Sequence, residues 1–125
     1  MKAMDKAQAL QSFWSGFGLT AYDSTVVPDD AKMPYITYSV STDSLDNVVN
    51  MNASLWYRTP SWKDITEKAD QIAEAIVKMN PPSIQLDNGR LYITKGTPFA
   101  QRRSDEDGNV RRIYLNIQAE FLTAY

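Results

Sequence analysis

The amino-acid sequence predicts an α+β fold, with a mainly antiparallel sheet, one long helix packed on a face of the sheet, and a short N-terminal helix. Between residues 113 and 121, apolar and polar residues alternate with a period of two, which is typical of a strand with one buried side. Between residues 60 and 79, apolar residues recur at helical spacing. Strand-like runs stand together on both sides of this helix, and that order indicates α+β.

The chain begins with a short helix, expected over residues 5–15. Asp5 is a suitable N-cap, and Gly16 or Gly18 a suitable stop. One bulky apolar face is predicted to consist of Leu10, Phe13, Trp14 and Phe17.

The next region alternates between irregular and strand-like segments. Residues 19–33 lack clear periodicity and form a long connection, either packed over the sheet or reaching a partner. Residues 35–42 and 48–58 alternate with a period of two, so we expect them to pair as an antiparallel hairpin.

The long helix has clear boundary signals. Thr59 is a good cap with Pro60 at the first helical position, and Ser61 with Asp64 is an alternative. Asn80-Pro81-Pro82 ends the helix, because proline lacks the next backbone donor. The apolar stripe of the helix consists of Trp62, Ile65, Ala69, Ile72, Ala73 and Ile76.

Three or four further strands are expected after the helix. Residues 84–86 and 90–94 are joined by a turn at Asn88-Gly89, whose residue types suit positive φ angles. Residues 98–103 and 111–122 form a final hairpin, with Ile113, Leu115, Ile117, Ala119 and Phe121 on its buried face.

Composition limits the function. The 125 residues fit one domain, residues 1–125, and the net charge of −2 disfavours nucleic-acid binding through overall charge. The absence of cysteine and histidine excludes thiolate chemistry and removes the commonest zinc ligand. No signal peptide or membrane span is evident, so we expect a soluble protein that stays in the cytoplasm where it is made.

No catalytic, cofactor or metal site is predicted. Asp105-x-Asp107-x-Asn109 starts like a calcium loop, but Val110 stands where glycine is required and Asn116 where the closing glutamate belongs. A small enzyme that pairs Asp87 with Asp105 or Glu120 is the alternative from another class, although a turn, a tip and a strand end give no reason to converge.

The tip of the final hairpin is the candidate interface. Asp107-Gly108 suggests a two-residue turn. Around the turn stand Arg102, Arg103, Asp105, Glu106, Asp107, Arg111 and Arg112. Exposed ion pairs contribute only ~0–1 kcal/mol each, so a solvated surface is the simpler interpretation. In a symmetric ring the same charges would pair between subunits.

Trp56 stands on the polar face of its strand, unlike the other two tryptophans. It is either an interface anchor or lies under a helix or the N-terminal segment.

Several motifs together resemble a known family. They are the Phe13-Trp14 helix, Val27-Pro28-Asp29-Asp30-Ala31, Pro34-Tyr35-Ile36-Thr37-Tyr38, Ala53-Ser54-Leu55-Trp56-Tyr57-Arg58, Asp87-Asn88-Gly89, Lys95-Gly96-Thr97-Pro98-Phe99-Ala100-Gln101 and Arg111-Arg112-Ile113-Tyr114-Leu115-Asn116-Ile117. Over nearly the whole chain they resemble the small tail terminator, or tail completion, proteins of bacteriophages and prophages with long non-contractile tails. These motifs are structural and not catalytic.

The resemblance implies a non-enzymatic virion protein at the head-proximal end of the tail. Such proteins form a homo-oligomeric ring, usually of six copies, that caps the tail tube, stops polymerisation of the major tail tube protein and joins the tail to the head completion or connector protein. DNA would pass the lumen without specific binding, which a neutral or mildly acidic wall favours. A head-tail connector or stopper protein shares this size and ring symmetry and is the alternative.

Overall fold

A computed structural model describes residues 6–39, 48–78, 83–86 and 89–123. Within them lie the elements α1 (Lys6–Ser15), β1 (Thr20–Asp23), β2 (Tyr35–Tyr38), β3 (Val48–Arg58), α2 (Lys63–Lys78), β4 (Ser83–Leu86), β5 (Gly89–Arg103) and β6 (Val110–Thr123). The strands form one sheet in the order β1-β2-β3-β6-β5-β4, in which only the β1–β2 pair is parallel. The predicted α+β fold is therefore confirmed.

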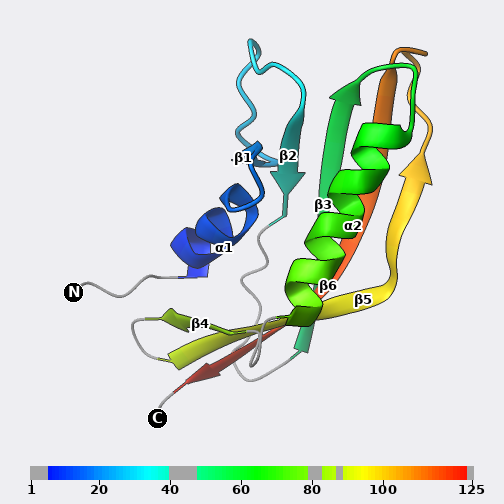
Figure 1. The fold of residues 1–125 in the computed structure, drawn as a ribbon. Helices are drawn as coiled ribbons and strands as arrows, with labels where there is room; N and C mark the ends of the chain where they lie inside the picture. Colours follow the sequence, from blue (N-terminus) through cyan, green and yellow to red (C-terminus); the bar gives the residue numbers. More distant parts are fainter. Residues whose placement is uncertain (1–5, 40–47, 79–82, 87–88, 124–125) are drawn as a thin grey trace.

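Both helices lie on the same side of the sheet. The long helix α2 packs across β3, β5 and β6, and α1 packs against β1 and β4 (Figure 1). The buried residues of both helices belong to one hydrophobic cluster with the inward-facing residues of the strands. The opposite face of the sheet is consequently free of helices in the described part of the chain.

The short helix α1 inserts aromatic side chains into this core. Leu10 and Trp14 are fully buried, and Phe13 meets the Trp14 ring edge-on at 4.8 Å between centroids. Phe17 is buried just beyond the helix end. Gly18 has a φ of 82°, a left-handed conformation that glycine adopts without steric cost. The predicted apolar face is thus confirmed, whereas the predicted cap at Asp5 lies outside the described residues.

Residues 19–33 contain a strand that the sequence does not reveal. Thr20–Asp23 pairs with β2 in parallel register as β1, and the prediction of an entirely irregular connection is wrong there. Only Ala21 of its four residues is fully buried. So short an edge strand has too few inward residues to produce a periodic pattern.

The antiparallel pairing of β2 with β3 is confirmed, as is that of β5 with β6. At the centre of the sheet β3 pairs with β6 along its whole length. The inward side of β6 is fully buried from Ile113 to Ala119, and the predicted burial of Phe121 lies outside the side chains that the structure describes. The continuation of the first predicted hairpin strand over residues 40–42 is also outside the described residues.

The long helix begins later than the sequence suggests. Its first residue is Lys63, so the prediction of Pro60 or Ser61 as the first helical residue is wrong. The Thr59 hydroxyl accepts the Ser61 N–H at 3.1 Å, and the Ser61 hydroxyl accepts the Lys63 N–H at 3.1 Å. These two side-chain bonds hold a turn before the helix and satisfy backbone N–H groups near its start, where a helix offers no acceptor of its own. Neither described helix is long and apolar enough to cross a membrane.

The predicted strands over 90–94 and 98–103 are one continuous strand, β5, and their separation is a wrong prediction. The pairing with β6 shifts register between Lys95 and Ala100. The Asn116 side-chain amide donates to the Pro98 carbonyl at 3.0 Å inside this irregularity. A Cβ atom on Gly96 would lie 2.8 Å from the Asn116 Cβ. Glycine thus permits the close approach that lets the strand bend and continue.

Candidate interaction surface

Strand alternation divides the four arginines of the last hairpin between the two faces of the sheet. Arg102 and Arg111 lie on the helix side, and Arg103 and Arg112 lie on the open side. This division follows from the period of two, because neighbouring residues of a strand point to opposite faces. The four residues therefore form two separate sites.

On the helix side, both arginines stack on the single indole of Trp62. The Arg102 guanidinium lies 4.6 Å and the Arg111 guanidinium 5.2 Å from the ring centroid. Arg111 also donates from Nη2 to the Pro60 carbonyl at 2.8 Å and from Nη1 to the Gly108 carbonyl at 3.0 Å. These contacts tie the turn before α2 to the hairpin, so Arg111 has an internal structural role.

On the open side, each arginine stacks on a different ring. The Arg112 guanidinium lies 4.5 Å from the centroid of Trp56, and its Nε donates to the Ser54 hydroxyl at 3.0 Å. Arg103 lies 4.9 Å from the centroid of Tyr114. Such contacts attract a cation to the face of an aromatic ring and orient it.

Aromatic rings continue from Trp56 toward the edge of the sheet. The Tyr35 ring lies 6.4 Å from Trp56, and the Tyr22 ring lies 5.6 Å from Tyr35 in an edge-on arrangement. Trp56 is half-buried, and its indole N–H donates to the Thr37 hydroxyl at 2.9 Å. No described helix covers it. We define the arginine–aromatic row as Tyr22, Tyr35, Trp56, Arg112, Arg103 and Tyr114.

Three members of this row were not among the residues that the sequence singles out. Tyr114 shares the polar face of its strand with Arg112, and that alternation could have identified it. Tyr35 is opposite Trp56 in the register of β2 with β3, and Tyr22 joins only through the unpredicted strand β1. Register is a property of the assembled sheet, so their convergence was not visible in the sequence.

The hairpin tip is a longer loop than predicted. Residues 104–109 join β5 to β6, and Gly108 has no positive φ, so the expected two-residue turn at Asp107-Gly108 is wrong. The Asp105 carboxylate accepts the Asp107 N–H, and the Asp107 carboxylate accepts the Asn109 N–H, both at 2.9 Å. Carboxylates that satisfy neighbouring backbone donors in this way stabilise a wider turn.

Asp107, one of the carboxylates at the hairpin tip, is also held in place by an ion pair. Asp107 forms an ion pair of 3.0 Å with Arg58 at the end of β3. The Asn109 backbone N–H, followed by the Arg58 guanidinium, holds the pKa of Asp107 below its ordinary value. Asp105 and Glu106 are exposed, and neither is in an ion pair within the described part of the chain. Within the described residues, the ion-pair partner of the tip is therefore Arg58 at the end of β3 and not one of the flanking arginines of the hairpin.

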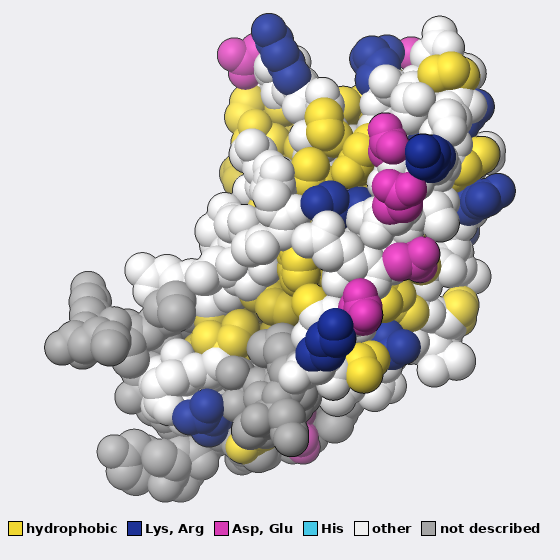
Figure 2. All heavy atoms as spheres, in the orientation of Figure 1, with side chains coloured by type: hydrophobic (Ala, Val, Ile, Leu, Met, Phe, Trp, Pro, Cys, Tyr) yellow, Lys and Arg dark blue, Asp and Glu magenta, His cyan; other side chains and the backbone are white. Residues whose placement is uncertain are grey.

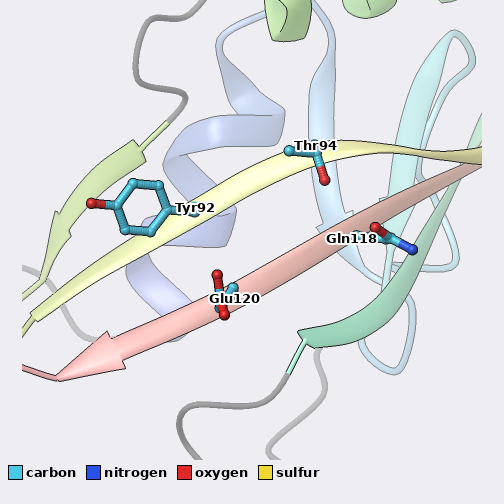
Figure 3. A pocket seen from close by; sticks show the side chains of 4 residues that line it. All are labelled: Tyr92, Thr94, Gln118 and Glu120. Atoms are coloured by element: carbon cyan, nitrogen blue, oxygen red, sulfur yellow. The ribbon is translucent and has the colours of Figure 1, made fainter.

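The other end of the open face has a small hollow between β5 and β6. It is lined by Tyr92, Thr94, Gln118 and Glu120, whose side chains lie in front of the sheet with α1 behind it (Figure 3). Its volume of about 80 Å³ is well below the several hundred Å³ of a typical ligand pocket. The hollow does not define a small-molecule site.

The outer side of α2 is acidic. Asp64, Glu67, Asp70 and Glu74 are all exposed, on the side of the helix away from its buried residues. Figure 2 shows their kind of side chain following the course of α2. Of these four, only Glu74 is in an ion pair with a described residue, Lys78 at 3.2 Å. We define these four residues as the acidic stripe.

The carboxylates considered for catalysis do not converge. Asp105 is in the tip loop, and Glu120 lies ten residues along β6 from Val110. At ~3.3 Å per residue the strand separates them by roughly 30 Å. Asp87 lies outside the described residues. Within the described ranges, no group of three or more potential metal-ligating acids gathers at one point.

The fold is shared with a chain of the virion of a native gene transfer agent (GTA) particle. The two chains are 20% identical, the TM-score is 0.64, and the superposition covers 90% of this chain and 94% of that chain. No protein-family model matches the sequence. No curated protein is significantly similar to it.

Proposed function

We propose that the protein is a structural component of a phage or phage-like virion. The observation that carries this proposal is the fold it shares, over nearly the full length of both chains, with a chain of the gene transfer agent virion. The best-developed surface of the described structure is an arginine–aromatic row suited to protein contact, and this supports an assembly role without catalysis.

Within that class, we propose a tail terminator. The support is the sequence resemblance given above, which extends from the Phe13-Trp14 helix to the last strand. The proposed protein forms a homo-oligomeric ring, expected to be a hexamer, at the head-proximal end of the tail. It binds the last ring of the major tail tube protein, prevents further addition of tube subunits, and offers its other surface to the head completion protein.

The proposal is tested by combining the protein with polymerising tube protein. Tubes formed in its presence are expected to be short and to carry a ring at one end in negative-stain images, and native mass spectrometry is expected to give a single ring mass. Tubes of unchanged length with no bound ring would refute the terminator role.

The alternative of a head-tail connector or stopper is compatible with the same fold match. It is distinguished by its partner. A connector would bind DNA-filled heads that have no tail and would leave tube polymerisation unaffected. Binding to isolated heads with no effect on tube length would therefore replace the terminator role with the connector role.

A further inference from the structure

The open face of the sheet has two like charges at paired positions of neighbouring strands. Arg103 on β5 is directly opposite Arg112 on β6 in the strand register. Like charges directly opposite each other destabilise a strand pair. Among the described strand residues, this face has one carboxylate, Glu120 near the far end of β6, and the loop carboxylate Asp107 is paired with Arg58. Neither Arg103 nor Arg112 is in an ion pair with a described residue. An incoming carboxylate would remove this unfavourable repulsion.

Both guanidiniums are held in place before any partner arrives. Arg112 is fixed by the Trp56 ring and the Ser54 hydroxyl. Arg103 is fixed by the Tyr114 ring and by the Gln101 side-chain oxygen, 3.3 Å from its Nη2. Side chains that are already ordered lose less conformational entropy on binding. Tyrosine, tryptophan and arginine are also the residue types that contribute most to the binding energy of protein interfaces.

The acidic stripe of α2 has the complementary properties. Asp64, Glu67 and Asp70 have no cationic partner among the described residues. From Asp64 to Glu74 the helix rises ~15 Å at 1.5 Å per residue. The row crosses five neighbouring strands from β1 to β5, a span of ~19 Å at ~4.8 Å between strands. The two surfaces thus match in sign of charge and approximately in length, and they lie on opposite sides of the molecule.

We propose that the arginine–aromatic row of one copy binds the acidic stripe on α2 of a second copy. This inference rests on the proposed function, since it names the contact between neighbouring subunits of the ring. The contact joins two different surfaces, so each copy uses both, and successive copies associate head to tail. Arg103 and Arg112 pair with the carboxylates, and the rings of Trp56 and Tyr35 cover the rest of the helix.

The test reverses charge on each surface in the full-length protein. The Arg103→Glu/Arg112→Glu variant is expected to weaken self-association by about tenfold or more in sedimentation velocity, because like charges then face each other. The single variants Arg103→Glu and Arg102→Glu are compared as well, because they make the same change at neighbouring residues on opposite faces, and only Arg103→Glu is expected to weaken association. Adding Glu67→Arg and Asp70→Arg to the double variant restores opposite charges and is expected to restore association.

A second measurement uses the absence of cysteine from the chain. A variant with Gln101→Cys beside the row and Gln71→Cys beside the stripe is expected to form a ladder of disulfide-linked oligomers under mild oxidation. Gln71→Cys combined with Lys32→Cys, at an exposed position outside both surfaces, is the control. This readout does not depend on charge reversal being tolerated by the fold.

The outcomes separate this inference from the proposed function. If the wild-type ring forms and caps tubes while Arg103→Glu/Arg112→Glu behaves identically and both cysteine pairs link equally, the contact is wrong and the function stands. A wild-type protein that neither self-associates nor caps tubes overturns both. Loss of binding to duplex DNA, with unchanged self-association in the arginine variant, would assign the row to nucleic acid and refute the contact between copies.

Discussion

Replacement of Arg111 by leucine is expected to lower the free energy of unfolding by more than any other arginine substitution in the last hairpin. The guanidinium donates hydrogen bonds to the carbonyls of Pro60 and Gly108 and stacks on Trp62. Hydrogen bonds to charged groups contribute ~1.5–3 kcal/mol each, and partial exposure puts these two at about 1 kcal/mol each. The stack adds ~0.5–1 kcal/mol, which gives a total of about 2.5 kcal/mol.

Arg102→Leu is the matched control for this prediction. Arg102 stacks on the same Trp62 ring, at 4.6 Å, but it donates no hydrogen bond to a described residue. Its loss is expected to cost only ~0.5–1 kcal/mol. The comparison therefore isolates two hydrogen bonds of Arg111. The bond to Pro60 fastens the turn before α2 to the hairpin, and the bond to Gly108 holds the loop of the hairpin itself.

The measurement is urea unfolding followed by circular dichroism, with the same slope assumed for both variants. Thermal unfolding should agree, because one kcal/mol corresponds to a shift of about 4 °C in Tm for a domain of this size. Equal losses of stability for Arg111→Leu and Arg102→Leu would refute the argument, since they would mean that the bonds to Pro60 and Gly108 contribute nothing.

Three further predictions concern the core, the bend in β5 and the response to alkali. Leu115→Ala, at a fully buried position in the central strand pair, should lower the free energy of unfolding by ~2–5 kcal/mol in urea titration, and a loss below 1 kcal/mol would contradict its place in the core. Gly96→Ala should cost ~1–3 kcal/mol because its Cβ would meet Asn116 at 2.8 Å, and an unchanged Tm would show that the strand relaxes without strain. Burial raises the pKa of Tyr38, whose hydroxyl donates to Gln11, with a smaller contribution from a nearby carboxylate. The associated stability is present below pH 10 and is lost as pH rises through the folded pKa, so Tyr38→Phe should flatten the alkaline decline measured by circular dichroism, and an unaltered decline would rule Tyr38 out as its source.

The sequence patterns that predicted the structure correctly were those that repeat over many residues. The strand 48–58 and the strand near 111–122 each have several inward residues, and the structure contains both, paired along their length. The long helix has a full apolar stripe and was found with an error of two or three residues at its start. Features fixed by few residues were missed. The strand β1 is too short to give a periodic pattern, and the loop at 104–109 is set by hydrogen bonds from the Asp105 and Asp107 side chains.

The candidate surface was predictable in part. Trp56, Arg103 and Arg112 were singled out from the sequence, and strand alternation puts neighbouring arginines of each strand on opposite faces. The register that pairs Arg103 with Arg112 on one face came only from the structure. The different environments of Arg102 and Arg103 were not predictable. They depend on Trp62 approaching one face of the sheet and Tyr114 standing on the other, and both are set by tertiary packing.

The sequence by itself determined the α+β class, the long helix, the central strand pair and the alternation that divides the charges of the hairpin, because each is encoded in local periodicity. Only the tertiary structure decided which arginines are used internally and which face outward on aromatic rings. It also decided that the acidic side of α2 and the arginine–aromatic row lie on opposite sides of the molecule. These relations join residues far apart in the chain, and sheet register and helix packing bring them together only when the whole core forms.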